Sequence, residues 1–216
     1  GEKIMANYVR WNMEFHQIND DAKKKLIELI SRVRKDQDHM WFGDLFVDEK
    51  TLTYKETEQY SWTLANIGPK WCYFEEMDID SMTYYGESAW SAPEDGVTKL
   101  LEILEEHDPN LITSLTYQDE GPNFFGAYVY RGNECLDSFE NDYDELIEMV
   151  CNEIEELEGK YINEEWEDQE SEDIFDESMW ECISNYQSEM VSDCIDTIEQ
   201  VIADEEKETV DDVPSK

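Results

Sequence analysis

The feature that most constrains this chain is an acidic surplus concentrated at one end. Residues 136–216 contain 30 acidic and 3 basic residues, whereas residues 1–135 contain 26 acidic and 13 basic residues. The 81 C-terminal residues therefore carry about two thirds of a net charge of −40. Self-repulsion on this scale lowers stability, so the fold must have a reason to tolerate it.

The composition still predicts a folded protein. Of the 216 residues, 40% are hydrophobic and 12% aromatic, which is too rich for a disordered chain and enough for one large domain or two small ones. The charge argues against direct binding to nucleic acid or to an anionic membrane, because phosphates would be repelled. Halophilic adaptation also gives acidic proteins, but it usually spreads the acid evenly.

The cysteines and the lack of long apolar stretches favour a cytoplasmic protein. No apolar stretch reaches roughly 18 residues, and no signal-peptide pattern opens the chain. The cysteine count is odd and no CxxC pair occurs, which predicts reduced thiols. These cysteines are Cys72, Cys135, Cys151, Cys182 and Cys194.

Residues 6–135 alternate strand and helix patterns and predict one α+β domain. In residues 8–15, apolar and polar side chains alternate with a period of two, as in a half-buried strand. Further strands are predicted at 81–90, 111–118 and 123–132. Residues 40–65 are predicted to form short strands or loops. The pattern favours an antiparallel sheet with helices on one face.

Two helices are predicted among these strands. The first follows N-cap candidates Asn19 to Asp21 and has an apolar face of Leu26, Leu29, Ile30 and Val33. The second has an apolar stripe of Val97, Leu100, Leu101 and Leu104. Ser91 and Glu94 precede this stripe at the spacing of a capping box.

Residues 136–216 carry no strand pattern and predict an acidic helical extension. Residues 142–160 place Leu146, Ile147, Val150, Ile154 and Leu157 on one helical face. A second helix is predicted over about 172–206. Its apolar residues recur every three or four positions over roughly thirty residues, which is about 45 Å of helix. It either packs along the preceding helix or pairs with a second copy, giving a homodimer.

Three ordered segments carry a resemblance to a known family. They are NIGPKW at 66–71, SAWSAPEDGVTKLLE at 88–102 and TYQDEGPNFFGAY at 116–128. They resemble the YubB-like ferredoxin-like domains of phages and plasmids over residues 6–135. The resemblance implies a ferredoxin-like sandwich and a mobile-element origin. It implies no chemistry, and it leaves residues 136–216 unexplained.

Motifs for catalysis or metal binding are lacking in the sequence. His16, His39 and His107 stand in no HExxH pattern, and no P-loop, GxSxG elbow or EF-hand spacing occurs. We therefore expect no enzyme, no cofactor and no metal site. The loops Gly68–Trp71 and Asp119–Gly126 are the candidate small-ligand loops, although turns explain both.

The tryptophans divide into two groups. Trp11, Trp62, Trp71 and Trp90 stand in strand or turn contexts, where burial in the core explains them. Trp166 and Trp180 stand among acidic residues instead. Each could anchor a partner, since Trp is favoured at interface centres. Each could equally staple the acidic segment to the helices.

The most acidic stretch is NEEWEDQESEDIFDE at 163–177, where nine of fifteen residues are Asp or Glu. It joins the two C-terminal helices. It is either a solvated surface that maintains solubility or a surface that imitates a phosphate backbone. The candidate partner-binding residues are Glu153, Glu156, Glu164, Glu165, Trp166, Glu167, Asp168, Glu170, Glu172, Asp173, Asp176 and Glu177.

These patterns lead to three functional hypotheses, of which the first is the leading one. The first is a phage-encoded, non-enzymatic nucleic-acid mimic that occludes a host nucleic-acid-binding protein with a basic cleft. The target would belong to restriction, CRISPR, recombination or transcription. The second is a protein-interaction module that uses apolar and Trp surface, with acid only for solubility. The third is a small-ligand-binding protein.

Overall fold

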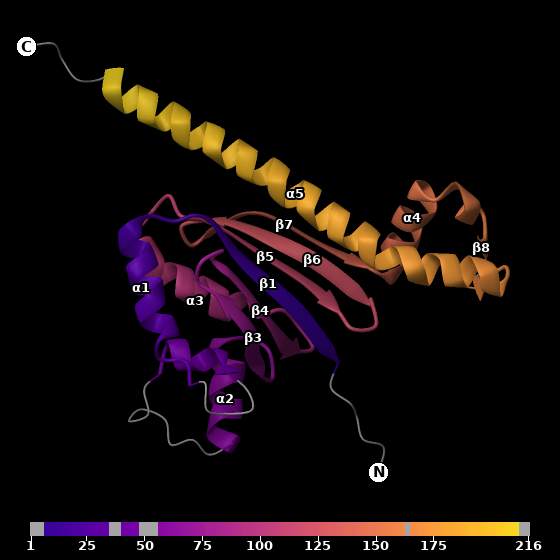
Figure 1. Cartoon of the computed structure of the whole chain (residues 1–216), viewed down its shortest axis with the longest axis horizontal. Helices are drawn as coiled ribbons and strands as arrows, with labels where there is room; N and C mark the ends of the chain where they lie inside the picture. Colours follow the sequence, from indigo (N-terminus) through magenta and orange to yellow (C-terminus); the bar gives the residue numbers. More distant parts are fainter. Residues whose placement is uncertain (1–6, 35–39, 48–55, 163–164, 212–216) are drawn as a thin grey trace, which may run out of the picture.

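The computed structural model describes residues 7–34, 40–47, 56–162 and 165–211. Figure 1 shows a large sheet with helices on both sides and a smaller unit beyond one end of the sheet. The chain order is β1 (Tyr8–Gln17), α1 (Asp20–Ile30), β2 (Met40–Trp41), η1 (Phe42–Leu45), α2 (Glu56–Asn66), β3 (Cys72–Asp78), β4 (Thr83–Ala89), α3 (Glu94–Glu105), β5 (Ile112–Asp119), β6 (Phe124–Arg131), β7 (Glu134–Asp142), α4 (Tyr143–Glu153), η2 (Glu155–Leu157), β8 (Tyr161–Ile162), β9 (Glu165–Trp166) and α5 (Gln169–Asp211).

The first strand, β1, is the centre of the sheet. The strand order is β2-β3-β4-β1-β5-β6-β7, and every neighbouring pair is antiparallel. β1 pairs with β4 on one side and with β5 on the other, where Val9 lies opposite Asp119. The predicted alternation is confirmed, because Val9, Trp11, Met13 and Phe15 are all buried.

α1 and α3 cover one face of this sheet. Their leucines pack on the odd-numbered side chains of β1 and on Leu115 of β5 in a single core. Asn19 accepts hydrogen bonds from the amides of Asp21 and Ala22, which confirms the predicted N-cap. The predicted cap of α3 is wrong: the helix starts after Pro93 without a side-chain cap.

α2 corrects a second expectation, since residues 56–66 form a helix where short strands or loops were predicted. Trp62 and Thr63 favour strands by intrinsic propensity. Tertiary contacts override that preference here. The indole of Trp41 donates to the hydroxyl of Thr63 at 2.9 Å, and its ring lies edge-on to Trp62 at 5.5 Å.

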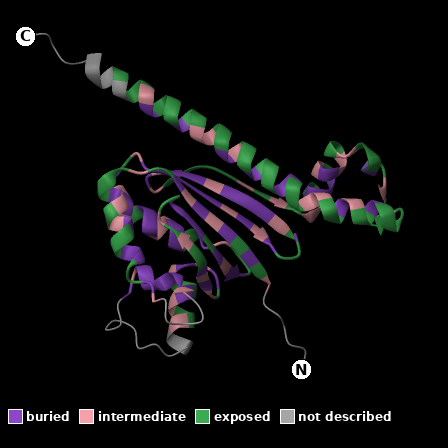
Figure 2. Cartoon of the chain, viewed as in Figure 1, coloured by how far each residue is buried: buried purple, intermediate pink, exposed green. Residues whose placement is uncertain are grey.

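α5 covers the opposite face of the sheet, so helices do not lie on one face only. Val191, Ile198 and Ile202 of α5 pack on Ile112 of β5 and on Ala127 and Val129 of β6. Phe175, Cys182 and Ile183 nearer its start are buried as well, and many of the other side chains of α5 are exposed (Figure 2). With 43 residues, α5 is about 64 Å long at about 1.5 Å per residue, longer than predicted.

β7 shows that the C-terminal region is not purely helical. It spans Glu134–Asp142 as the edge strand beside β6, so the predicted boundary at 135/136 falls inside a strand. The sequence hides this strand because most of its side chains are exposed, and alternation marks a strand only when one face is buried.

α4 is shorter than the predicted helix 142–160. Asp142 caps it in a full capping box with Glu145. The helix ends before Ile154, whose backbone is extended, and the short η2 then carries Leu157 into the core. The apolar residues predicted within 142–160 therefore lie on two elements, α4 and η2, with Ile154 between them, and not on one continuous helix.

The tryptophans expected in the core behave differently from one another. Trp11 is 2% exposed, as predicted, while Trp62 and Trp71 are half-buried. Trp90 contradicts the prediction, because it is 49% exposed. Its backbone has a φ of +74°, a conformation that residues with a side chain rarely adopt, directly after the end of β4.

None of the helices in the described ranges is long and apolar enough to span a membrane.

Candidate functional site

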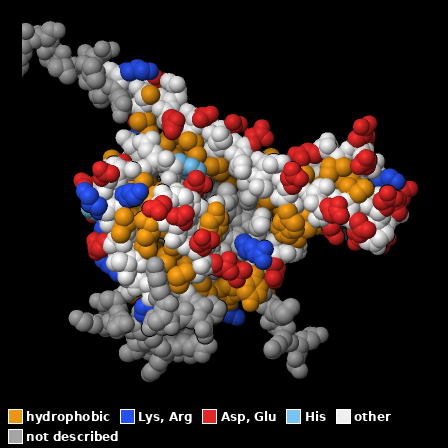
Figure 3. Space-filling model, viewed as in Figure 1, with side chains coloured by type: hydrophobic (Ala, Val, Ile, Leu, Met, Phe, Trp, Pro, Cys, Tyr) orange, Lys and Arg blue, Asp and Glu red, His pale blue; other side chains and the backbone are white. Residues whose placement is uncertain are grey.

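The acidic stretch belongs to a folded unit that projects from the end of the sheet. We call residues 143–182 the acidic lobe; it comprises α4, η2, β8, β9 and the first third of α5 (Figure 1). The sequence of the lobe contains 17 acidic residues and one basic residue, Lys160. Figure 3 shows many acidic side chains on the visible face of this projecting unit.

The lobe is held by its own apolar core. Leu146, Val150, Leu157 and Phe175 are fully buried there. The same cluster includes Phe125 of β6, so the core continues onto the end of the sheet. The carboxylates of the lobe therefore stand on a packed unit that is fixed to the sheet.

Trp166 staples the lobe together. Its ring centroid lies 5.0 Å from that of Tyr161 and 5.0 Å from that of Phe175. This packing favours the structural interpretation of Trp166 over the partner anchor. Trp180 differs, because its side chain is 37% exposed and lines a cavity against the outer face of β1.

The predicted acidic residues are all exposed, apart from Glu164, which lies outside the described residues. Three of them also have a structural role. Glu153 accepts a hydrogen bond from the thiol of Cys182 at 3.1 Å. Glu167 and Asp168 pair with the ammonium of Lys160 at 2.9 and 3.5 Å.

Asp168 additionally caps the start of α5. Its carboxylate accepts hydrogen bonds from the amide and the hydroxyl of Ser171, at 2.8 and 2.7 Å. These bonds, together with the charge of Lys160, hold the pKa of Asp168 below its ordinary value. The Asp168 carboxylate thus fixes the helix that displays its acidic neighbours.

The other predicted acids form an outward-facing array. Asp173 accepts a hydrogen bond from Gln169 at 3.1 Å. The remaining ones make no ion pair or side-chain hydrogen bond with another described residue: Glu156, Glu165, Glu170, Glu172, Asp176 and Glu177. Residues 170–181 carry six acids over about 18 Å of helix, one per about 3 Å.

The two candidate small-ligand loops line different cavities. Gly68 lines one of about 180 Å³ with Tyr117 and Glu140, whereas Gly121 and Asn123 line another of about 250 Å³. Trp71 instead lies against Tyr8, with 5.1 Å between ring centroids. The structure thus does not bring the predicted ligand loops into one site.

The acidic residues of these loops stabilise the local fold. Asp119 is fully buried, and one of its oxygens accepts hydrogen bonds from the amides of Gly121 and Asn123. The hydroxyl of Tyr117 donates to Glu140 at 2.9 Å. Burial is the largest cause that raises the pKa of Tyr117, so its hydroxyl stays protonated.

Both histidines in the described ranges take part in hydrogen bonds. His16 shares a hydrogen bond with the hydroxyl of Ser114 at 2.8 Å, and burial lowers its pKa. His107 contributes its carbonyl oxygen to Asn19, and His39 lies outside the described residues. Over the described residues, no three His, Cys, Asp or Glu side chains gather as a metal site would require.

Sequence reasoning missed one surface, a groove of about 630 Å³ between α5 and β7. Its signal was present, because the apolar repeat of α5 is broader than one buried face needs. Tyr186, Met190 and Cys194 belong to that repeat. Met190 and Cys194 are half-buried against the α5–sheet core, and all three also line the groove. The groove was not predicted because one of its walls is β7, a strand that the sequence pattern does not predict.

Comparison with known proteins gives no family for this chain, since no family model, no curated protein and no solved structure matches it.

Proposed function

We propose that this protein is a non-enzymatic inhibitor that presents carboxylates in place of nucleic-acid phosphates. Its partner would be a host DNA- or RNA-handling protein with a basic cleft, of the restriction, CRISPR, recombination or transcription type. The observation that carries the proposal is the acidic lobe, in which exposed carboxylates stand on a packed core; six of them form no ion pair with another described residue.

Electrostatics explains how such a surface would act. Nucleic-acid-binding proteins hold phosphates with Lys and Arg, and B-DNA carries one phosphate per ~3.4 Å along each strand. The spacing of about 3 Å per acid along residues 170–181 is of the same order. Long-range attraction would speed the encounter with a basic cleft, and affinity would fall as salt rises.

The packed core of the lobe supports this role over mere solubility. A solubilising tail needs no fixed geometry, because exposed charge keeps a protein in solution wherever it lies. Here Phe175 and Trp166 pack under the acidic surface, and Asp168 caps the helix that carries it. Fixed charges lose less conformational entropy when a partner binds.

The small-ligand alternative is the least supported. The cavities lined by its two predicted loops measure about 180 and 250 Å³. Sites for drug-sized ligands usually occupy about 300–1,000 Å³. The protein-interaction alternative has a specific observation in its favour, the α5–β7 groove.

We also propose that β3-β4-β1-β5, with α1 and α3, forms a ferredoxin-like unit within the larger sheet. The support lies in the connections: β1–α1–β3 and β4–α3–β5 are interleaved crossovers of the split βαβ type. β2 would then extend one edge, and β6 with β7 the other. We further propose a phage or plasmid origin, which rests on the resemblance of residues 66–71, 88–102 and 116–128 to the YubB-like domains. Action in the host cytoplasm would follow from the target class.

The proposal is tested by displacement from DNA. Bacterial lysate is loaded on a DNA column at low salt, and the column is washed with the purified protein. We expect the parent protein to displace a defined set of DNA-binding proteins. A lobe variant with Glu165→Gln, Glu172→Gln, Asp176→Asn and Glu177→Gln should displace them much less.

A matched control separates the lobe from total charge. The control carries Glu76→Gln, Asp80→Asn, Glu102→Gln and Glu106→Gln, which remove the same number of exposed charges elsewhere. It should displace as well as the parent. Equal displacement by both variants, or no displacement by the parent, would show that the lobe does not act as a phosphate mimic.

A further inference from the structure

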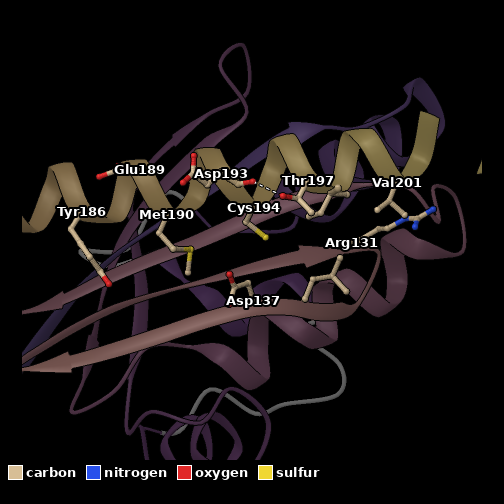
Figure 4. A pocket seen from close by; sticks show the side chains of 11 residues that line it. Arg131, Asp137, Tyr186, Glu189, Met190, Asp193, Cys194, Thr197 and Val201 are labelled. Carbon is tan, nitrogen blue, oxygen red and sulfur yellow. Dashed lines mark hydrogen bonds between the residues drawn. The ribbon is translucent and has the colours of Figure 1, made fainter. Parts of the chain in front are cut away.

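The groove between α5 and β7 lies outside the acidic lobe and has a mixed surface. Figure 4 shows that side chains from α5 form one wall, facing Asp137 of β7. Along α5 the groove runs from Tyr186 to Val201, which is about 24 Å of helix. It therefore has the length of a binding channel for a short helix of about four turns.

Apolar side chains line this groove, and three of them are open to solvent. Leu136 is 44% exposed, Tyr186 39% and Val201 45%. Met190 and Cys194 continue the row at four-residue spacing along α5. Ridges with this spacing are the surfaces on which helices pack against other helices. A continuous apolar row on so acidic a chain indicates a contact surface.

Acidic side chains accompany the apolar row. Asp137 lies on the β7 side, and Glu189 and Asp193 lie on α5. Within the described ranges, none of the three forms an ion pair with Lys or Arg. Arg131 does not neutralise them, because its guanidinium pairs with Glu205 at 3.2 Å and with Asn110 at 2.8 Å.

These charges decide which occupant fits. A second copy of the chain would place carboxylates against carboxylates in an already strongly negative dimer. Strand addition is also disfavoured, because β7 has a register shift beside Asp137 and carries acids along its free edge. A partner with apolar and basic side chains can pack on the apolar row and also pair with the rim, that is, with Asp137, Glu189 and Asp193.

We propose that the α5–β7 groove binds an amphipathic basic helix of a partner protein. Apolar side chains of that helix, spaced at i, i+4 and i+7, would contact Leu136, Met190 and Val201. Its Lys and Arg residues would pair with Asp137, Glu189 and Asp193. This helix-in-groove mode is independent of what the acidic lobe binds.

The test uses two synthetic peptides of about 16 residues, the length of the groove along α5. One places Leu on a single helical face with Lys on its flanks; the other has the same composition scrambled. Fluorescence anisotropy at about 0.15 M salt measures both affinities. We expect the amphipathic peptide to bind at least about tenfold more tightly, a difference of about 1.4 kcal/mol.

Two groove variants should remove this preference. Leu136→Ser with Val201→Ser removes apolar surface, and Asp137→Asn with Glu189→Gln and Asp193→Asn removes the rim charge. The matched controls are Ile27→Ser with Leu64→Ser, and Asp80→Asn with Glu102→Gln and Glu106→Gln, all at exposed positions. The controls should keep the preference of the parent protein.

A footprint on the unmodified protein covers the case in which a groove variant fails to fold. The amphipathic peptide should slow alkylation of Cys194 in the groove and leave Cys151 of the lobe unaffected. Equal binding of the two peptides would overturn the proposal. So would a preference that survives the groove variants, or Cys194 alkylation that the peptide does not change.

Discussion

At the scale of single residues, Gln187 links α5 to the sheet. Its buried side-chain amide donates to the carbonyl oxygens of Tyr117 and Gly126, both at 2.9 Å. Replacing it with Leu would leave two buried carbonyls with fewer partners. We expect Gln187→Leu to lower the free energy of unfolding by about 1–3 kcal/mol in urea denaturation.

A second glutamine on the same helix provides the comparison. Gln200 is exposed and donates to Asp204 at 3.0 Å. Gln200→Leu should change the free energy of unfolding by no more than about 0.5 kcal/mol. Similar losses in the two variants would mean that the buried hydrogen bonds of Gln187 do not hold α5 on the sheet.

Cys182 gives a prediction about pH. Burial and the carboxylate of Glu153 raise the pKa of its thiol to about 12. At a pH below its pKa a thiol is mostly protonated and therefore unreactive. At pH 9 only about one Cys182 in a thousand is a thiolate. We expect Cys182 to be alkylated much more slowly than the exposed Cys135 in native protein at pH 9, as mass spectrometry can measure.

The substitution Glu153→Gln tests how the carboxylate of Glu153 affects the pKa of the Cys182 thiol. It removes the negative charge that disfavours the thiolate, so the pKa of Cys182 should fall and its alkylation should accelerate. Alkylation of Cys151 should remain the same. An unchanged rate at Cys182 would show that burial alone protects this thiol.

At the scale of elements, Ile183 fixes the junction between α5, the lobe and the sheet. It is fully buried in the cluster that includes Phe125 and Leu146. Ile183→Ala should lower the free energy of unfolding by about 2–5 kcal/mol, because it leaves a cavity in a packed core. Thermal or urea denaturation measures this loss.

Val201 is the matched position for that experiment. It lies on the same helix but is 45% exposed. Val201→Ala should therefore cost well under 1 kcal/mol. If both substitutions cost the same, the junction is not the tightly packed contact that its burial indicates.

The elements also show what the sequence could and could not predict. β1 and α3 were predictable because each buries one side on a single core, which produces a clear period. β6 buries both faces, and its apolar run after a Gly-Pro-Asn turn marked it instead. β7 was missed because an exposed edge strand has no period, and α2 because its contacts with Trp41 decide its structure. These contacts join distant residues, which local patterns do not register.

The candidate site was predictable in part for a related reason. Charge clustering located the acidic lobe, because charge is visible in composition alone. The sequence alone leaves the role of Trp166 open, since only the positions of Tyr161 and Phe175 show that it packs inward. The α5–β7 groove needed two elements, and one of them was not predicted.

At the scale of the whole molecule, net charge should control stability. A charge of −40 destabilises the compact state through self-repulsion, and salt screens it. We expect the melting temperature to rise between about 0.02 and 0.5 M NaCl. The four-residue lobe variant should start from a higher melting temperature and gain less from salt than its matched control.

The reason lies in the distribution of charge. The lobe holds 17 acids and one Lys in 40 residues, so its acids repel one another more than those elsewhere. A melting temperature that is independent of salt would contradict this picture. So would equal gains for the two variants, because evenly shared repulsion would leave the lobe with no special part in it.

The central position of β1 has a consequence for how the chain folds. Val9 pairs with Asp119, so the middle of the sheet joins residues 110 positions apart. The chain loses conformational entropy when so long a loop closes, and the stabilising contacts form only afterwards, which slows folding. During synthesis, β1 must stay unpaired on one side until β5 has left the ribosome, and α5, which covers the other face, docks last.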